Sequence, residues 1–361
     1  MEFLSLTLNG AEDALSKELS SFGISSLIGD FHAKFDAGKK ELLQFAYFSQ
    51  ASKRICKILS VENLSKELLN KQNSDSEIQI ASLKIPKELL QADEAFSIEV
   101  YSENEQLRKS IIKALEKELK IKYNSNNKIV LIIDQKNNEI IYAKDIFSFD
   151  FSKRDYKVFI NSRTIHPITA FCLISLAGKS PEKTYFDPFC SDGTIAIELS
   201  YFLKKSSHNF FRKEIFNTPF FDFGTEDYLT SLDKKNLKRS KNKINVIASD
   251  ISPSNLVSTK KNAKIAMLHK DIRFTRKELK WIDLTMQKNS IDTIISFPQK
   301  YSVALKDFYK YLDVILKKNA KIYYATERLD HPLKDFGFKI KEIDTIHQGQ
   351  LKISLYEIAK A

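Results

Sequence analysis

Cysteine and glycine are scarce in this sequence, and long hydrophobic runs are absent. Its three cysteines, Cys56, Cys172 and Cys190, lie far apart and form no Cys-x-x-Cys pair. This spacing excludes a disulfide framework and a cysteine-rich zinc site. No apolar stretch reaches the roughly 18 residues that a membrane span requires. The first residues turn acidic and polar too soon for a secretory signal. We therefore expect a cytoplasmic protein without a membrane-spanning segment.

Basic residues outnumber acidic ones. Lysine and arginine number 57 and aspartate and glutamate 46, which gives a formal net charge of +11. A charge of this size is compatible with binding a polyanion through phosphate contacts. Only nine glycines, together with abundant Lys, Ile, Asn, Phe and Tyr, also fit a skewed genomic base composition. Charge alone leaves both explanations open.

Length and composition indicate a folded protein with more than one domain. The chain has 361 residues, of which 43% are hydrophobic and 29% charged, a balance typical of globular proteins. Compact domains usually contain about 100–200 residues, so a chain of this length predicts two of them. We place the main boundary between Asp150 and Asn161 and interpret the basic segment 151–165 as a linker.

The first part of the chain, residues 1–60, is predicted to be a small α+β domain. Phe3–Leu8 and Phe31–Gly38 alternate like strands, whereas Ala11–Gly23 and Lys40–Leu59 have the apolar spacing of helices. An order of strand, helix, strand and helix requires a sheet covered by helices.

A polar stretch, Ser60–Lys87, opens the second part, residues 61–150. It is followed by the predicted strand Ala95–Ser102 and by the strongly amphipathic helix Asn104–Lys122. The part ends in a predicted hairpin across Lys136 and Asn137. The two strands of this hairpin are Lys128–Gln135 and Asn138–Phe147.

Residues 166–361 change to a regular alternation of buried strands and helices. This alternation predicts an α/β Rossmann-like domain with a parallel, doubly wound sheet. A terminal hairpin across Gln348 and Gly349 adds an antiparallel edge to it. The predicted parallel strands are Thr184–Phe189, Asn245–Asp250, Ile272–Glu278, Asp292–Pro298 and Ala320–Glu327.

A long insertion, Phe202–Asn245, carries a run of basic residues. Such runs are usually solvated surface, and a phosphate-binding face is the alternative. The run consists of Lys234, Lys235, Lys238, Arg239, Lys241 and Lys243.

Acidic residues end three successive predicted strands. Asp187 ends the first and precedes a turn with Asp192 and Gly193; Asp250 ends the second, and Glu278 ends the third. The carboxyl ends of parallel strands meet at the crevice where doubly wound sheets bind ligands. A carboxylate at the second tip can accept both hydroxyls of a ribose. Acidic groups beside a glycine turn suit a cationic ligand such as S-adenosylmethionine better than a pyrophosphate.

The segment DPFCSDGTIAIE, residues 187–198, resembles the DPFCGSGTIxIE signature of a known family. This family comprises the methyltransferases that carry an N-terminal THUMP domain and modify guanine in tRNA or rRNA. KRDYKVF and HPITA, residues 153–159 and 166–170, resemble the RxY and HPAxLxPxLA segments that lead into its catalytic domain. The resemblance covers nearly the whole chain, although its THUMP match rests on the order of the elements more than on identity.

The resemblance implies a ferredoxin-like domain at residues 1–60, a THUMP RNA-binding domain at 61–150 and a class I methyltransferase domain at 166–361. It also implies S-adenosylmethionine as the cofactor, with no need for a metal. Asp250 would hold the ribose, Glu278 the adenine amino group and the turn after Asp187 the methionine end. The implied cofactor residues are Asp187, Pro188, Cys190, Asp192, Gly193, Thr194, Asp250, Ile251 and Glu278.

The fourth predicted parallel strand ends in SFPQ, where the family has NPPY or a variant of it. In that motif an Asn or Asp oxygen and a backbone carbonyl bind the hydrogens of the target amine, and the aromatic residue stacks on the base. Ser296 offers a hydroxyl in place of the amide, and Gln299 replaces the aromatic residue, for which Phe297 or Tyr301 could substitute. The implied catalytic residues are Ser296, Phe297 and Pro298.

The resemblance therefore implies methylation of the exocyclic N2 amino group of a guanosine in structured RNA, with tRNA favoured over rRNA. We expect a monomer. Two alternatives stay open. One is an RNA-binding protein whose site is eroded at Gln299 and at Ser191, which replaces a glycine of the first motif. The other is a methyltransferase that acts on a different RNA base nitrogen.

Overall fold

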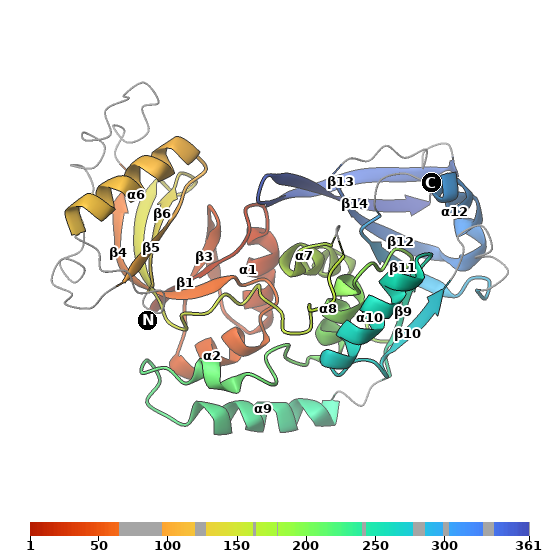
Figure 1. The fold of residues 1–361 in the computed structure, drawn as a ribbon, viewed down its shortest axis with the longest axis horizontal. Coiled ribbons are helices and arrows are strands. Elements are labelled where there is room, and N and C mark those ends of the chain that lie inside the picture. Colours follow the sequence, from red (N-terminus) through yellow and green to blue (C-terminus); the bar gives the residue numbers. More distant parts are fainter. Residues whose placement is uncertain are drawn as a thin grey trace. The chain divides into compact units, whose positions relative to one another are not determined.

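The computed structural model describes residues 1–64, 96–119, 128–161, 164–178, 180–239, 243–276, 286–298, 303–327 and 336–360. They form two compact units (Figure 1). The chain crosses between the two units at several points, one of which, between Phe151 and Ser152, lies inside the segment predicted as the linker. Unit 1 comprises Met1–Ala46, Ser52–Phe151 and Glu214–Thr225, and unit 2 comprises Tyr47–Ala51, Ser152–Lys213 and Glu226–Ala361.

Unit 1 contains a seven-stranded sheet with the order β2-β3-β1-β4-β7-β6-β5. Its first elements follow the order β1-α1-β2-β3-α2-β4, and neighbouring strands among them are antiparallel. β5 and β6 are parallel and are joined through α6, because a parallel pair requires a crossover. The elements are β1 (Glu2–Leu6), α1 (Glu12–Ser21), β2 (Ser26–Gly29), β3 (His32–Asp36), α2 (Lys39–Phe48), β4 (Arg54–Asn63), β5 (Ser97–Tyr101), α6 (Glu105–Leu119), β6 (Lys128–Asp134) and β7 (Glu139–Asp145).

The predicted helix Lys40–Leu59 is wrong in its second half. The helix α2 ends at Phe48, and Arg54–Asn63 form the strand β4. β4 lies between β1 and β7 and pairs antiparallel with both. Backbone hydrogen bonds to two neighbouring strands therefore outweigh the helical spacing of its apolar residues. Ile55 and Val61 are β-branched and suit a strand.

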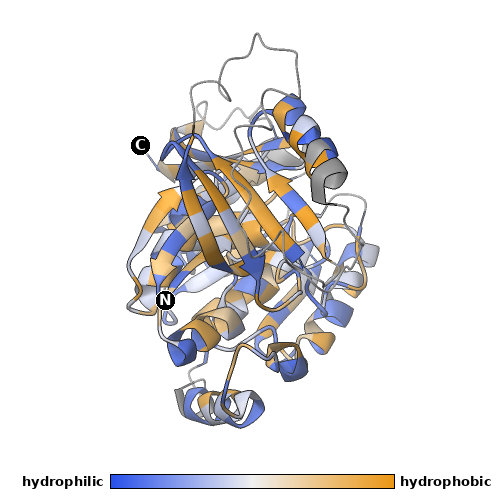
Figure 2. Cartoon of the chain, turned by 90° about the vertical axis from the view of Figure 1, so that its left-hand side faces the viewer, coloured by the Kyte–Doolittle hydropathy of each residue, from blue (hydrophilic) through white to orange (hydrophobic). Residues whose placement is uncertain are grey.

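The strands of the two predicted N-terminal parts lie in one continuous sheet. β4 of the first part pairs with β7 of the second, and one apolar cluster contains Leu4 and Leu6 together with Ile132 and Ile141. In Figure 2 the strands nearest the viewer are coloured mostly as hydrophobic, whereas the helices alternate between the two colours. The division into separate domains near residue 60 stays a prediction.

Unit 2 contains a seven-stranded sheet with the order β10-β9-β8-β11-β12-β14-β13. The five strands from β10 to β12 are parallel neighbours, and β14 pairs antiparallel with β12 and β13. The predicted doubly wound sheet with a terminal antiparallel hairpin is confirmed. The strands are β8 (Thr184–Asp187), β9 (Asn245–Asp250), β10 (Ile272–Arg276), β11 (Ile291–Ser296), β12 (Leu316–Thr326), β13 (Phe338–Gln348) and β14 (Leu351–Lys360). The helices are α7 (Pro167–Ala177), α8 (Thr194–Lys204), α9 (Thr225–Arg239), α10 (Pro253–Ile265) and α12 (Val303–Ile315). The 3-10 turn η1 (Lys213–Phe216) follows α8 in the chain, and its residues from Glu214 onward belong to unit 1.

The strand order of unit 2 determines where a ligand can bind. The chain runs outward from β8 to β10 and then restarts at β11 on the other side of β8, so the switch point lies between β8 and β11. Phe186, Ile294 and Ile322 lie in register and share a cluster with Phe308 and Leu312 of α12. Figure 1 shows α7, α8 and α10 on the other side of the sheet. Because helices cover both faces, the strand ends are what remains for a ligand.

The structure describes only some of the residues that the sequence singled out. In the predicted basic run, Lys234, Lys235 and Lys243 are described and are exposed to solvent. Across the described ranges, no helix has both the length and the apolar character needed to cross a bilayer. Glu278, Trp281, Gln299, Tyr301 and Lys241 lie outside the described residues.

Candidate functional site

The carboxyl ends of β8, β9 and β11 carry the candidate site. Asp187 ends β8, Asp250 ends β9 and Ser296 ends β11. The Ser296 hydroxyl donates a hydrogen bond of 2.5 Å to Asp187 Oδ1. The backbone N–H of Ser191, in the turn after β8, donates to Asp250 Oδ2 at 3.0 Å. The structure thus brings two of the three predicted acidic strand tips to one edge, and the third, Glu278, lies outside the described residues.

Asp187 is buried and only partly satisfied. Its Oδ1 accepts from Ser296 and from the N–H of Phe189 at 3.2 Å, whereas Oδ2 has no partner among the described residues. Burial raises the pKa of Asp187 to about 7, and the negative charges of Asp250 and Asp192 add to this increase. The two hydrogen bonds act in the opposite direction and lower the pKa, but their effect is smaller than that of burial. A carboxyl that ionises near neutral pH and keeps an unpartnered oxygen can receive a cationic donor.

Asp250 is held by backbone groups on both carboxylate oxygens. Oδ2 accepts from Ser191, and Oδ1 accepts from the N–H of Ser252 at 2.9 Å. Each carboxylate oxygen keeps further lone-pair capacity for a ligand hydroxyl. The next residue, Ile251, has a side chain that is 50% exposed. An exposed apolar group beside a carboxylate can cover a flat ring.

The turn between β8 and α8 packs against α10. Gly193 has a φ of 86°, and a Cβ there would lie 2.7 Å from Thr259 Cγ2 and 3.3 Å from Thr259 Cα. Cys190 Sγ lies 3.3 Å from Thr259 Oγ1, and burial raises the pKa of its thiol well above the ordinary value. The space that a Cβ at Gly193 would need is therefore occupied by Thr259 of α10. Cys190 is therefore a packed thiol and not a nucleophile.

Gly193→Ala is expected to lower the free energy of unfolding by about 2–4 kcal/mol, because a positive φ costs an L-residue roughly 1–2 kcal/mol and Thr259 would also have to shift. Urea unfolding followed by circular dichroism measures this loss. Gly349→Ala is the matched control, since Gly349 has a φ of 63° and nothing within 4 Å of its added Cβ. Equal losses in the two variants would contradict the role of the Thr259 contact.

Ser191 adopts a left-handed conformation, with a φ of 50°, at the position where the family signature has glycine. Its carbonyl accepts from the Thr259 hydroxyl at 2.8 Å, so the strained residue is held in place by α10. A side chain in this region costs about 1–2 kcal/mol. The predicted departure from the signature therefore has a structural consequence, which is a strained turn.

Ser191→Gly is expected to raise the free energy of unfolding by about 0.5–1 kcal/mol, since glycine adopts a positive φ freely but gains entropy in the unfolded chain. Thermal unfolding checks the gain. Ser191→Ala removes the same hydroxyl and keeps the Cβ, so it should bring no gain. A lower melting temperature for Ser191→Gly than for the unchanged chain would show that the turn is not strained.

Asp192 is held by Lys157, which the sequence analysis did not single out. Lys157 Nζ lies 2.8 Å from Asp192 Oδ2 and 2.5 Å from Thr194 Oγ1, and it also donates to Thr164 Oγ1 and to the Ile165 carbonyl. Asp192 Oδ1 accepts from the N–H and the hydroxyl of Thr194 at 3.2 and 2.8 Å. Both carboxylate oxygens are thus used within the protein. This arrangement favours a positioning role for Asp192 over direct contact with a cofactor.

A buried ion pair joins the linker to α8. The side chains of Arg154 and Glu198 are both 0% exposed, and Arg154 Nε lies 2.9 Å from Glu198 Oε1. The hydroxyl of Tyr156 and the amide of Gln50 donate to the same carboxylate at 2.7 Å each. Glu198 ends the DPFCSDGTIAIE segment, whereas Arg154 and Tyr156 belong to KRDYKVF. The two motifs that carry the family resemblance therefore pack against each other.

The three predicted catalytic residues lie at and just beyond the end of β11. Ser296 has no exposed surface, Phe297 is half-buried and Pro298 is buried. His166, before α7, caps that helix by accepting from the N–H of Ile168 at 3.3 Å.

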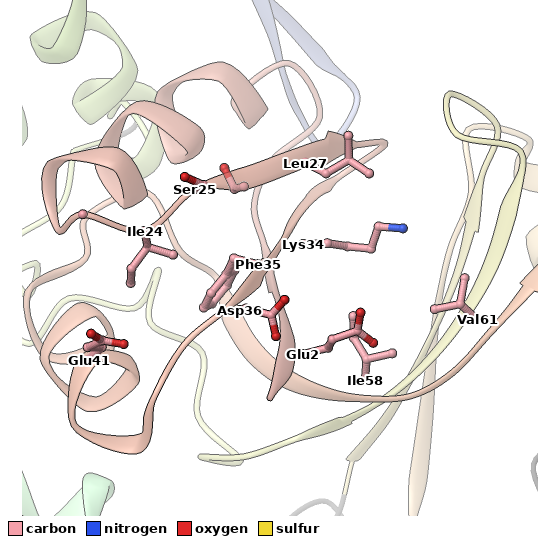
Figure 3. Close-up of a pocket in the computed structure, with 12 residues that line it drawn as sticks. Glu2, Ile24, Ser25, Leu27, Lys34, Phe35, Asp36, Glu41, Ile58 and Val61 are labelled. Atoms are coloured by element: carbon pink, nitrogen blue, oxygen red, sulfur yellow. The ribbon is translucent and has the colours of Figure 1, made fainter.

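A separate hollow lies in unit 1 over strands β1 to β4 (Figure 3). Its volume is about 500 Å³. Glu2, Asp36 and Glu41 contribute carboxylates to its lining, and its lysine, Lys34, is paired with Glu139. Surplus negative charge disfavours a phosphate ligand. Among the described residues, none of the predicted site residues lines this hollow.

The fold matches solved structures over essentially its full length. SMU.472, solved in complex with SAH, superposes with a TM-score of 0.71 at 15% identity, covering 100% of this chain and 98% of that one. TrmN from Thermus thermophilus superposes with a TM-score of 0.64 at 18% identity, covering 100% and 99%. With the strand order and the turn after β8, these matches define a two-part α/β protein with a Rossmann-like methyltransferase fold.

Residues 154–307 match the model of the UPF0020 family, described as the RMKL-like methyltransferase domain. The chain is 26% identical over 261 residues to the tRNA (guanine(6)-N2)-methyltransferase of Methanocaldococcus jannaschii, over 67% of this chain and 66% of that enzyme. It is 24% identical over 204 residues to the ribosomal RNA large subunit methyltransferase K/L of Alcanivorax borkumensis, over 55% of this chain and 29% of that enzyme. The aligned segments thus cover less than two thirds of the length of either of these two relatives.

Proposed function

We propose that the chain is an S-adenosylmethionine-dependent methyltransferase that modifies the N2 amino group of a guanosine in structured RNA, with tRNA as its substrate. The observation that carries the proposal is Asp187, a buried carboxyl at the switch point of a methyltransferase sheet, whose Oδ2 has no partner in the described part of the chain. The similarity to the tRNA (guanine(6)-N2)-methyltransferase of M. jannaschii supports N2 of guanosine as the methylated nitrogen and tRNA as the substrate. The relative that acts on ribosomal RNA keeps rRNA as the alternative substrate.

The residues at the strand ends fit the cofactor. The unpartnered Oδ2 of Asp187 would accept from the ammonium of the methionine end, and Asp250 would accept from the ribose hydroxyls. The exposed Ile251 would cover the adenine ring, and Glu278 stays the prediction for the adenine amino group. When bound, the cofactor supplies an electrophilic methyl group on its sulfonium. Pro188, Cys190, Asp192, Gly193 and Thr194 would shape the turn that receives it.

The target amine would be oriented by β11. The Ser296 hydroxyl donates its hydrogen to Asp187, so its oxygen keeps lone pairs and becomes a better acceptor by polarisation. Together with the carbonyl of Phe297, it would bind the two hydrogens of the exocyclic amine, and Pro298 would stiffen the chain that follows. Approach of the amine nitrogen to the methyl group is then a matter of positioning.

Unit 1 would hold the RNA. The order β1-α1-β2-β3-α2-β4, with the sheet order β4-β1-β3-β2, is the split βαβ arrangement of a ferredoxin-like domain. We assign residues 1–60 to that domain and residues 61–150 to a THUMP domain. Structured RNA is recognised mainly through its shape and phosphates, which is the role assigned to this half of the chain.

The test is nucleoside mass spectrometry of RNA incubated with the full chain and S-adenosylmethionine. N2-methylguanosine is expected in unmodified tRNA transcripts and not in a large-subunit rRNA fragment. The reverse pattern would overturn the tRNA assignment. A methylated base other than N2-methylguanosine would overturn the assigned nitrogen and leave the enzyme class standing.

A second candidate is an RNA-binding protein without catalysis, which the strained Ser191 favours because it replaces a glycine of the cofactor turn. Calorimetric titration separates the two. Tight binding of S-adenosylmethionine supports the enzyme, and no binding at millimolar concentration supports the RNA-binding protein.

A further inference from the structure

Unit 2 has a surface on which exposed apolar side chains gather beside lysines. We call it the Phe159–α10 surface; it comprises residues 158–160, the outer side of α10 and Met267. Of the ten large hydrophobic side chains that are exposed in the described part of unit 2, six lie here. They are Val158, Phe159, Ile160, Val257, Ile265 and Met267, with exposed fractions from 38% to 66%.

The two segments of this surface are bonded to each other. The N–H of Phe159 donates to Asn262 Oδ1 at 3.0 Å, and Asn262 Nδ2 donates to the Phe159 carbonyl at 3.1 Å. Lys261 Nζ lies 4.5 Å from the centroid of the Phe159 ring. Val257, Lys261 and Ile265 follow one another at four-residue spacing on the outer side of α10. The backbone of Phe159 is therefore fixed while its ring stays partly exposed.

The charge of the surface has one sign. Residues 251–270 contain no aspartate or glutamate, and Lys260, Lys261, Lys264 and Lys270 in this stretch are all exposed. Exposed apolar groups among these lysines fit a ligand with negative charge and flat rings. A single-stranded nucleic acid has both, since lysines bind its phosphates and aromatic rings stack on its bases.

The surface adjoins the candidate active site. Asn262, whose amide holds Phe159, also donates to the Asp192 carbonyl at 2.8 Å. Asn161, which follows the exposed residues, donates to Ser191 Oγ at 3.5 Å. Both contacts reach the turn after Asp187. A strand bound on this surface therefore lies next to the site that would receive its base.

We propose that the Phe159–α10 surface binds the unpaired RNA strand beside the target nucleotide, with Lys260, Lys261 and Lys264 on its phosphates and the ring of Phe159 stacked on a neighbouring base. This assignment rests on the proposed function, since it takes RNA as the substrate. It adds a binding surface within unit 2 to the RNA-binding role given to unit 1.

The first experiment measures the affinity of the full chain for an unmodified tRNA transcript by fluorescence anisotropy between 50 and 200 mM KCl. The triple variant K260Q/K261Q/K264Q is expected to bind about 10- to 100-fold more weakly, and the slope of log affinity against log salt should fall by about 2–3. The matched control is K339Q/K341Q/K352Q, which removes three exposed lysines from the terminal hairpin. Its affinity and slope should change less than threefold.

The second experiment separates stacking from apolar burial. Phe159→Leu keeps an apolar side chain but loses the ring, and it should weaken RNA binding about 10-fold, whereas Phe159→Trp should retain binding. Calorimetry should find the same affinity for S-adenosylmethionine in these variants as in the unchanged chain.

Three results would overturn the proposal. Equal losses in the two triple variants would mean that only total charge matters, while the proposed function stands. Unchanged RNA binding, with K260Q/K261Q/K264Q instead losing affinity for anionic phospholipid vesicles, would assign the surface to a membrane. An unchanged chain that binds S-adenosylmethionine but no RNA at any salt would overturn both this surface and the RNA substrate.

Discussion

Asp187→Asn is expected to weaken the binding of S-adenosylmethionine by about 10- to 100-fold at pH 8, the effect of losing a hydrogen bond to a charged group. In the unchanged chain the affinity should rise as the pH increases through about 7, because Asp187 must be ionised to bind the ammonium and its pKa lies there. This part of the pH dependence should vanish in the variant. Calorimetric titrations between pH 5.5 and 8.5 measure both effects.

The stability of the ligand-free chain should depend on the ionisation of the same carboxyl. It should decrease as the pH rises, whereas the affinity for S-adenosylmethionine should increase. The folded-state pKa of Asp187 lies above its ordinary value of 3.8, so its contribution is fully present below about pH 4 and is lost as the pH rises through about 7. The free energy of unfolding should therefore decrease over this window, by an amount on the order of 4 kcal/mol.

Asp292→Asn is the control for both measurements, because Asp292 lies at the amino-terminal end of β11 and pairs with Lys317. It should leave the affinity for S-adenosylmethionine and its pH dependence unchanged. Persistence of the full pH dependence in Asp187→Asn would show that another group binds the ammonium.

Arg154→Met is expected to lower the free energy of unfolding of unit 2 by about 3–5 kcal/mol, because it leaves the carboxylate of Glu198 buried without its cation. Hydrogen bonds from Tyr156 and Gln50 remain but supply no opposing charge. For a domain of this size, the melting temperature should fall by roughly 6–20 °C. Differential scanning calorimetry measures this change.

The control for this prediction is Lys321→Met, which breaks an ion pair with Glu357 whose side chains are 49% and 30% exposed. Exposed pairs contribute about 0–1 kcal/mol, so its melting temperature should barely move. The double variant Arg154→Met/Glu198→Leu should recover part of the lost stability, because no charge is then left buried. If Arg154→Met alone were as stable as the unchanged chain, this would mean that water reaches Glu198.

The placement of Asp187 and Asp250 was predictable, because alternating strands and helices force a parallel sheet and parallel strands end at one edge. The partners of these residues were not. The hydrogen bond from Ser296 to Asp187 joins residues 109 positions apart, and the pKa of Asp187 depends on burial that no local pattern reports. Lys157 lies in a segment that was interpreted as a linker and as a family marker, whereas in the structure its ammonium group holds Asp192.

The sequence by itself determined the α/β class, the order of the elements in unit 2 and the carboxylates of Asp187 and Asp250 at its strand ends. These follow from the spacing of apolar residues and from turn chemistry, which act over a few positions. Only the tertiary structure decided that residues 54–63 form β4 and not the rest of a helix, since a strand is stabilised by partners that are distant in the chain. It also decided that Phe159 lies beside Lys261, a contact that packing against α10 creates and that neither segment encodes alone.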